Sequence, residues 1–249
     1  MKTISFCNQK GGVAKTTSAL NVASGLQNKG YKVLLVDIDP QSSLTYSLGI
    51  LADDLPATIY DLLKGEKTAG ELIQDINGLH IIPSSLELAG AELTIAGQPG
   101  REYLLKDGLK DVVKYDFVII DTPPSLGLLT LNALTASDCI YVPVQSDFLS
   151  IKGLKLLTDT VGMIKKRINP GLHIAGVIVT RYDSRKRLNR DAVELLQRTF
   201  GDVLFKTIIR ENVTLGEAPA AGQSVFDYDS RSNGAEDYGN LVKEIIERG

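Results

Sequence analysis

Short runs of apolar and β-branched residues recur along the chain and are separated by longer mixed segments. These runs are solidly apolar rather than alternating, which is typical of strands that are covered on both faces of a parallel sheet. The pattern predicts strands at Thr3 to Cys7, Lys32 to Val36, Leu79 to Ile82, Phe117 to Ile120, Cys139 to Val142 and Ile174 to Val179.

Segments with helical spacing lie between these runs. Apolar positions recur every three or four residues in 16–27 and 151–164, and the last segment, 235–248, places them on one face. Residues 51–100 are less regular, and we expect short helices there at one edge. The alternation of strand and helix predicts an α/β fold: a doubly wound, mainly parallel sheet with helices on both faces and a ligand site at the carboxyl ends of its strands.

The composition is that of one folded domain. The chain has 249 residues, of which 43% are hydrophobic and 23% charged, and we expect a single domain over 1–249. The net charge is −3, so nucleic-acid binding requires a local basic patch. Because the apolar runs are far shorter than the ~20 residues that cross a bilayer and no leader pattern is visible, we expect a cytoplasmic protein. Cys7 and Cys139 are expected to be buried thiols.

A glycine-rich segment follows the first predicted strand and precedes a helix. It reads Lys-Gly-Gly-Val-Ala-Lys-Thr-Thr over residues 10–17. The glycines allow a tight turn with inward N–H groups, and the helix adds its positive N-terminal end, which favours a polyphosphate. Lys15 is placed to reach the terminal phosphates, and the Thr16 hydroxyl is placed to hold Mg²⁺. The segment is a variant phosphate loop, because Ala14 occupies the position of the last glycine in the common pattern.

This variant loop, with an additional lysine at its start, resembles that of the ParA/MinD family of ATPases, the deviant Walker A group of P-loop NTPases. The resemblance covers the chain from Lys2 to Glu247 and implies ATP and Mg²⁺ as cofactors. The first lysine of the family, matching Lys10, reaches across a dimer interface to the phosphates held by the other subunit, which implies a homodimer when ATP is bound. The expected nucleotide-binding residues of the loop are Lys10, Gly11, Gly12, Val13, Ala14, Lys15, Thr16 and Thr17.

Carboxylates follow two further predicted strands. Alternation places Asp37 and Asp39 on the same side of the second strand's end, where both can face the phosphates. The alternative for either residue is that it only caps the next helix. The resemblance assigns Asp39 to positioning or polarising the attacking water, with Asp37 as support. Asp121 ends a hydrophobic run, as the acid of a Walker B strand does, and residues 122–124 are expected to begin a switch loop that senses the γ-phosphate. The predicted metal-binding residues are Thr16, Asp39 and Asp121.

Phosphoryl transfer requires charge compensation and an aligned water molecule. Lys10, Lys15, Mg²⁺ and the loop amides would supply the first and Asp39 the second, so these three side chains are the predicted catalytic residues. The motifs contain no evident arginine finger, which predicts slow basal hydrolysis. A cation supplied in trans contributes ~10³–10⁵ in rate to other P-loop enzymes, and we expect a partner protein to stimulate hydrolysis here.

A basic cluster stands out in this acidic chain. Five of the ten residues 181–190 are Lys or Arg, which is typical of phosphate contacts on DNA. Relatives that bind the nucleoid carry an arginine matching Arg185, so the resemblance implies ATP-dependent dimers that bind DNA without sequence preference. The segment 165–167 is a second candidate patch, for which the polar end of a helix is the alternative. The residues expected to reinforce Arg185 are Lys186, Arg187 and Arg190.

Residues 209–219 resemble a family segment that reads Ile-Pro-Arg-Asn-Val-Arg-Leu-Ser-Glu-Ala-Pro. Here Arg210 stands for proline, Glu211 for the first arginine, and Thr214 for the second, which contacts DNA in some relatives. We expect Arg210 or Arg231 to compensate for that loss. The segment lies near the adenine pocket in relatives, and the residues expected there are Asn212 and Pro219.

Two alternatives share this fold. A membrane-riding ATPase of the MinD type requires a basic amphipathic C-terminal helix, whereas 241–249 has balanced charges and apolar residues better explained as core. The second alternative is a metabolic enzyme. A dethiobiotin-synthetase-like ligase would lack the signature lysine that matches Lys10, and an iron–sulfur reductase would require exposed cysteines as cluster ligands. We therefore expect a nucleoid-associated ATPase that positions a plasmid, chromosome or other cargo with a ParB-like centromere-binding or adaptor protein, and no membrane.

Overall fold

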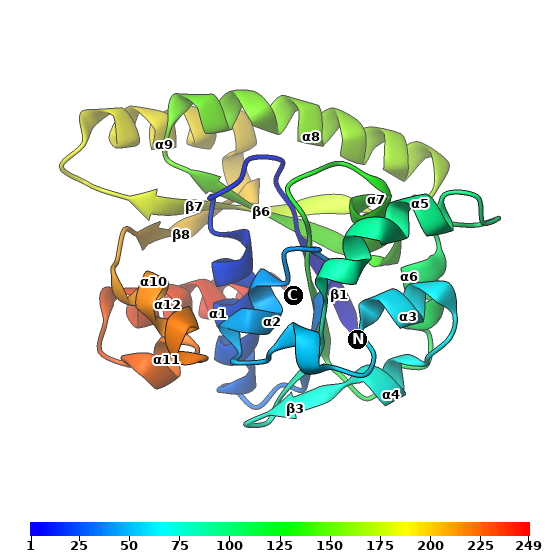
Figure 1. The fold of residues 1–249 in the computed structure, drawn as a ribbon. Coiled ribbons are helices and arrows are strands. Elements are labelled where there is room, and N and C mark those ends of the chain that lie inside the picture. Colours follow the sequence, from blue (N-terminus) through cyan, green and yellow to red (C-terminus); the bar gives the residue numbers. More distant parts are fainter.

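An eight-stranded sheet forms the centre of the computed structural model (Figure 1). The structure describes the backbone of residues 1–249 and all side chains except those of Asp53, Phe148, Leu149, Ile151 and Lys152. The strand order is β3-β4-β2-β5-β1-β6-β7-β8, and only the edge pair β3 and β4 is antiparallel. The strands are β1 Lys2–Phe6, β2 Val33–Asp37, β3 Gln74–Ile76, β4 Leu79–Ile82, β5 Phe117–Asp121, β6 Cys139–Gln145, β7 His173–Tyr182 and β8 Leu204–Arg210.

The predicted doubly wound, mainly parallel sheet is confirmed, and all six predicted strands are present with ends shifted by a few residues. Two strands were not predicted. β3 has only three residues and lies at the sheet edge, and β8 is interrupted by the exposed Lys206. Neither forms a long uninterrupted apolar run, which explains why the pattern did not reveal them.

The helices cover both faces of the sheet, as expected (Figure 1). The three predicted helices correspond to α1, α8 and α12, and residues 51–100 hold short helices together with the β3–β4 hairpin. The α-helices are α1 Lys15–Gln27, α2 Ser43–Ser47, α3 Ile59–Lys64, α4 Ala69–Leu72, α5 Ala91–Ile95, α6 Leu104–Gly108, α7 Leu128–Ala136, α8 Phe148–Arg167, α9 Arg187–Phe200, α10 Thr214–Glu217, α11 Val225–Tyr228 and α12 Asn233–Arg248. Four 3₁₀ turns lie at Ala52–Asp54, Leu86–Gly90, Gly201–Val203 and Ala218–Ala221.

Side chains along the central strands alternate between two apolar cores. In β2, Val33 and Leu35 pack with α1 and α12 on one face, whereas Leu34 and Val36 pack with α3, α6 and α7 on the other. A third cluster joins β6 and β7 to α8 and α9. Burial on both faces explains why the strands read as continuous apolar runs. None of the helices in the described chain is both long enough and apolar enough to cross a bilayer.

The register of the central strands brings the predicted motifs together. Phe6 of β1 is paired with Asp121 of β5, and Asp121 is paired with Asp37 of β2. The three strands are parallel and therefore end at the same edge of the sheet. The loop after β1 and the carboxylates at the ends of β2 and β5 consequently meet there, as the fold class predicts.

Candidate functional site

The loop between β1 and α1 lines a cavity of about 690 Å³ at the carboxyl edge of the sheet. Gly12 has φ +74° and Ala14 has φ +65°, both in the left-handed region. Glycine adopts this conformation freely, but an alanine does so at a cost of ~1–2 kcal/mol. Ala14 is also the N-cap of α1 and makes no side-chain hydrogen bond there. The strained turn therefore leaves the first amides of α1 available to an anion.

Lys15, Thr16 and Asp121 meet beside this loop. The Thr16 hydroxyl donates to Asp121 Oδ2 at 2.6 Å, and Lys15 is buried. Asp121 is fully buried, and no described group bonds to its Oδ1 atom. Burial, followed by the nearby Asp37 carboxylate, raises the pKa of Asp121 to about 8, so its anion requires a cation nearby. A threonine hydroxyl beside an orphaned carboxylate oxygen fits Mg²⁺, which commonly binds one or two carboxylates and keeps several waters.

Asp37 and Asp39 lie close in sequence but have different surroundings. Asp37 is fully buried and accepts hydrogen bonds from the Asp39 N–H at 3.1 Å and from the N–H and hydroxyl of Thr45 at 2.9 and 2.8 Å. Burial raises its pKa to about 6. Asp39 lines the cavity, and its Oδ1 accepts from the Gln41 N–H at 2.9 Å. Asp37 does not line the cavity, and its bonds to Thr45 favour the alternative, in which it holds the start of α2 and does not face the phosphates.

Lys10 does not line the cavity in the single chain. Its Nζ lies 2.7 Å from Asp147 Oδ2 and 2.9 Å from the Ser150 hydroxyl at the start of α8. Asp147 is also the N-cap of α8, because its Oδ1 accepts from the Ser150 N–H at 2.8 Å. Burial raises the pKa of Asp147, but the bonds from Lys10 and Ser150 outweigh it and hold the pKa below its usual value. Asp147 was not predicted as a site residue, although an aspartate directly before a helical segment is a capping signal.

Segments far apart in sequence form the opposite wall of the cavity. Arg181 and Asn212 line it, together with Tyr238 of α12. Arg181 has φ +52°, which is strained for arginine, and its Nη1 lies 3.4 Å from the Gly12 carbonyl. Pro219 is absent from the lining, so its predicted place in the adenine pocket is not supported by the geometry. Arg181 was counted only in the basic cluster of residues 181–190, and no local motif marks Tyr238, so neither was predicted at this cavity.

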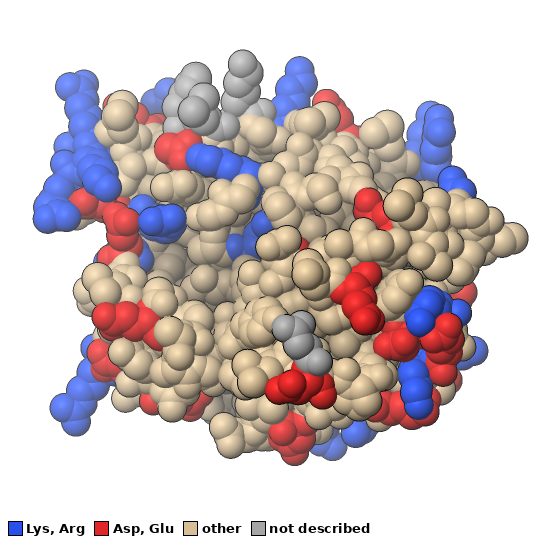
Figure 2. Space-filling view, in the orientation of Figure 1, with Lys and Arg blue, Asp and Glu red and all other residues tan. Residues whose placement is uncertain are grey.

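The predicted basic cluster lies at a corner of the molecule. Figure 2 shows Lys and Arg side chains gathered over the loop between β7 and α9. Arg185 is exposed and makes two hydrogen bonds of 2.9 Å to Asp183, and Lys186 lies 3.5 Å from Glu211. Arg187 pairs loosely with Asp191 at 3.9 Å, and Arg190 is exposed. These exposed pairs contribute little to stability and leave the cations accessible to another anion.

Arg210 and Arg231, the two residues expected to compensate for Thr214, differ sharply. Arg231 is exposed in the turn between α11 and α12. The Arg210 guanidinium binds Asp237 at 2.6 Å and also contacts Glu236, and these carboxylates raise its pKa further. Two carboxylates already neutralise this cation. The structure thus favours a role for Arg210 in attaching β8 to α12, not a DNA contact.

The remaining segment, residues 165–167, forms the last turn of α8. Lysine and arginine at a helix C-terminus interact favourably with its dipole. The helix-end interpretation therefore accounts for this patch.

Comparison with known proteins identifies the relatives of the chain. A family model described as an AAA domain matches residues 1–174. The chain is 43% identical to the sporulation initiation inhibitor protein Soj of Bacillus subtilis, over 100% of this chain and 99% of that protein. It is 42% identical to the chromosome-partitioning ATPase Soj of Treponema pallidum, over 99% and 98% of the two chains. A solved structure of cobyrinic acid a,c-diamide synthase from Mycobacterium smegmatis, with bound ATP analogue and magnesium, has a TM-score of 0.88 at 33% identity and covers 99% of this chain and 95% of that one.

Proposed function

We propose that this chain, which belongs to the ParA/Soj family of partition ATPases, is a switch that dimerises on ATP, binds DNA without sequence preference and positions a DNA or protein cargo. It is an ATPase that uses ATP and Mg²⁺. The observation that carries the proposal is that Lys15, Thr16 and Asp39 line one cavity, next to a loop with unpaired helix amides, and that Asp121 lies behind Thr16 at 2.6 Å from its hydroxyl. This set provides what phosphoryl transfer requires.

Each of these groups has a distinct task in the proposed reaction. The loop amides and Lys15 bind and orient the phosphates, and Thr16 and Asp121 would hold Mg²⁺. The metal ion, when bound, neutralises charge that develops on the phosphate oxygens. Asp39 orients the attacking water, and its own orientation is fixed by the bond from the Gln41 N–H. Burial of the site strengthens each of these electrostatic contacts.

Dimerisation supplies a second lysine to each site. Lys10 lies on the same loop as Lys15 but is directed to Asp147 and away from the cavity. A face-to-face dimer would bring Lys10 of each chain to the nucleotide of the other. This arrangement makes ATP the condition for pairing, because two facing loops without phosphates would oppose their positive charges.

The dimer would contain two copies of the basic cluster, one from each chain, which supports the DNA-binding part of the proposal. A dimer has two copies of the cations Arg185, Lys186, Arg187 and Arg190. It would therefore bind DNA more tightly than a monomer, and its DNA affinity would fall more steeply with salt. Arg231 is an additional exposed candidate. A ParB-like centromere-binding protein or another cargo adaptor would then stimulate hydrolysis and release the dimer from the nucleoid. The relatives named Soj, one of which is a chromosome-partitioning ATPase, support the partition part of the proposal.

Two observations weigh against the other functions of this fold. The apolar face of α12 is core, since Tyr238, Leu241 and Ile245 are each at most 1% exposed, which leaves no apolar face for a membrane. Cys7 and Cys139 are buried free thiols, as predicted, and burial raises the pKa of each to about 11. Thiols of this kind are poor cluster ligands.

A DNA mobility-shift experiment with ATP, ADP and no nucleotide tests the proposal. We expect a shift of unrelated DNA sequences with ATP and Mg²⁺ only. The matched control is Lys15→Ala, which should bind neither nucleotide nor DNA. Equal shifts with ATP and ADP would contradict the proposed switch.

A further inference from the structure

Asp39 belongs to a closed ring of buried hydrogen bonds. The Asp39 N–H donates to Asp37 Oδ1 at 3.1 Å, and the Thr45 hydroxyl donates to Asp37 Oδ2 at 2.8 Å. The Thr45 hydroxyl oxygen accepts from the Ser84 N–H at 3.0 Å, and the Ser84 hydroxyl donates to the Asp39 carbonyl at 2.8 Å. The ring therefore connects Asp39 to α2 and to the segment that follows β4.

Every bond of this ring has a defined direction. Because an amide N–H only donates, the Thr45 hydroxyl accepts from Ser84 and gives its own proton to Asp37. Asp37, Thr45 and Ser84 are fully buried, so solvent does not compete for these bonds. A buried network whose members are all satisfied is rigid and favours one arrangement of the groups that it joins. The ring is thus suited to fix the backbone at Asp39.

The turn that follows Asp39 is strained. The Ser42 N–H donates to the Asp39 carbonyl at 2.9 Å, which closes a tight turn before α2. Ser42 has φ +53°, a left-handed conformation that is costly for a residue other than glycine, and its side chain makes no capping bond. Such conformations persist where the surrounding contacts over-determine them, and they cluster at functional sites. The Ser84 hydroxyl is the second donor to the Asp39 carbonyl and thus one of the contacts that hold this turn.

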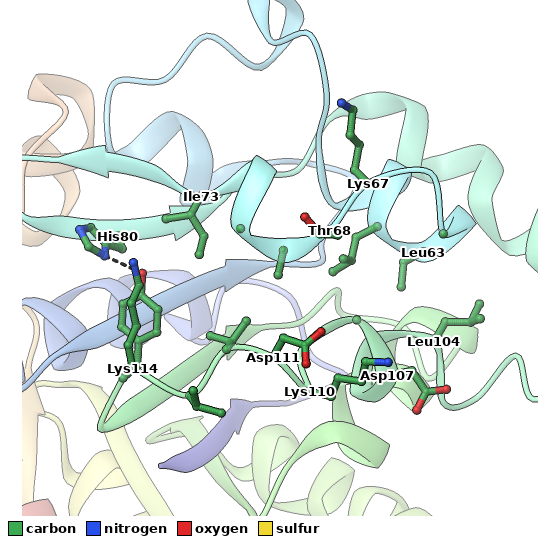
Figure 3. A pocket seen from close by; sticks show the side chains of 18 of the residues that line it. Leu63, Lys67, Thr68, Ile73, His80, Leu104, Asp107, Lys110, Asp111 and Lys114 are labelled. Atoms are coloured by element: carbon green, nitrogen blue, oxygen red, sulfur yellow. Dashed lines mark hydrogen bonds between the residues drawn. The ribbon is translucent and has the colours of Figure 1, made fainter.

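The segment that carries Ser84 is itself fixed from two sides. It follows β4, which pairs with β2. The Ile59 N–H at the start of α3 donates to the Pro83 carbonyl at 2.9 Å. Within β4, His80 Nδ1 lies 2.6 Å from the Tyr115 hydroxyl, as Figure 3 shows beside a second cavity that α3 and α4 line. Groups on rigid elements are held more precisely than groups on loops, so Ser84 is well placed to hold the turn.

We propose that Ser84 and Thr45 are positioning residues for ATP hydrolysis that hold the Asp39 carboxylate in place, a role that rests on the proposed function of Asp39 in orienting the attacking water. Asp39 lines the nucleotide cavity, whereas Ser84 and Thr45 are not among its lining residues. Their hydroxyls therefore act on the reaction through Asp39 and not through contact with the nucleotide.

Removal of the Ser84 hydroxyl should slow hydrolysis and leave nucleotide binding intact. In Ser84→Ala the Asp39 carbonyl keeps the Ser42 N–H as a donor, so the turn loses one contact without an unpaired buried acceptor. We expect the single-turnover rate of ATP cleavage to fall about ten-fold, because a misplacement of about 1 Å can cost ~10²-fold in rate. The Kd of a fluorescent ATP analogue should change by less than about two-fold, because Lys15 and the loop amides are retained.

Ser137→Ala is the matched control for this substitution. Ser137 is also buried, and its hydroxyl donates to the Ala133 carbonyl at 2.7 Å. It lies between α7 and the start of β6, and hence at the edge of the parallel sheet opposite the nucleotide cavity. This variant should keep the parent hydrolysis rate. A loss of rate as large as that of Ser84→Ala would overturn the proposal.

Two substitutions of Thr45 separate its hydroxyl from its shape. Thr45→Val keeps the branched shape and removes the hydroxyl, so it should slow hydrolysis as Ser84→Ala does. Thr45→Ser keeps the hydroxyl and should retain a rate within about two-fold of the parent protein. Equal rates in these two variants would overturn the proposal. This pair decides the outcome if circular dichroism shows that Ser84→Ala does not fold.

The positioning role is also overturned if Ser84→Ala cleaves ATP at the parent rate, or if its ATP affinity falls by the same factor as its rate. Asp39→Ala distinguishes this failure from that of the proposed function. A parent-like rate in Asp39→Ala would remove Asp39 from catalysis and overturn both. An inactive Asp39→Ala beside a fully active Ser84→Ala would overturn the positioning role alone.

Discussion

Lys10 and Asp147 form an ion pair within one chain, with 2.7 Å between the lysine Nζ and the carboxylate oxygen. This ion pair has to break before Lys10 can contact the nucleotide of a second subunit. The two side chains are 37% and 34% exposed, and pairs of this kind contribute ~0.2–1 kcal/mol. The pair therefore opposes dimerisation weakly.

Asp147→Asn should remove this ion pair and make ATP-dependent dimerisation easier. Asparagine keeps the capping bond at the start of α8 but removes the charge that holds Lys10. We expect half-maximal dimerisation at an ATP-analogue concentration up to ~five-fold lower than in the parent protein, measured by sedimentation velocity. An unchanged or higher concentration would show that the pair does not restrain Lys10.

Arg181→Asn should stabilise the fold and weaken ATP binding at the same time. Asparagine tolerates the left-handed backbone better than arginine, so the free energy of unfolding should rise by ~0.5–1 kcal/mol. The guanidinium at the Gly12 carbonyl is removed, so ATP should bind several-fold more weakly. Denaturant unfolding and titration with a fluorescent ATP analogue measure the two effects. A variant with unchanged affinity would place Arg181 outside the nucleotide contact.

Arg185→Glu/Lys186→Glu should weaken DNA binding without affecting ATP-dependent dimerisation. The slope of log affinity against log salt should fall by ~1 for each DNA phosphate that the variant no longer neutralises. Arg198→Glu is the matched control, because Arg198 is 80% exposed on α9 outside the cluster. Equal weakening of binding in the control would mean that overall charge, not this corner, binds DNA.

Glu244→Gln should destabilise the fold in a pH-dependent way. Burial raises the pKa of Glu244, but bonds from the Lys206 and Thr207 N–H groups, the Thr207 hydroxyl and Arg248 outweigh it and hold the pKa below its usual value. A lowered pKa contributes stability that is present above the unfolded-state value, near 4.5, and is lost as pH falls through the folded-state value.

We therefore expect Glu244→Gln to lower the free energy of unfolding by about 1–2 kcal/mol at pH 7. The difference from the parent protein should shrink as pH falls below about 4.5. Urea unfolding at several pH values measures it. A difference that stays constant with pH would show that the charge is not responsible.

The parts of the site that lie on contiguous motifs could be predicted from the sequence. The phosphate loop, Asp39 and Asp121 each follow a predicted strand, and the parallel sheet brings strand ends together, so the meeting of Lys15, Thr16, Asp39 and Asp121 could be anticipated. The family and the fold class are confirmed on the same basis. The common feature is that the chemistry is local and its place in the fold is fixed by strand order.

Contacts between distant segments could not be read in this way. Asp147 meets Lys10 across 137 positions, and Tyr238 reaches the cavity from the last helix. The sequence places Asp37 and Asp39 on the same side of the strand end, but the Asp37 carboxylate accepts a hydrogen bond from the Thr45 hydroxyl. Arg210 looked like a surface cation until α12 placed Asp237 against it. In each case the partner, and hence the role, is set by packing that no local pattern records.

The central claim, that two chains pair through ATP, is tested most directly by light scattering on the Asp39→Ala variant with ATP and Mg²⁺. This substitution should block hydrolysis and leave phosphate binding by Lys15 intact. We predict a mass near twice 26.9 kDa with ATP and a monomer with ADP or without nucleotide. A monomer in saturating ATP and Mg²⁺ would contradict the account.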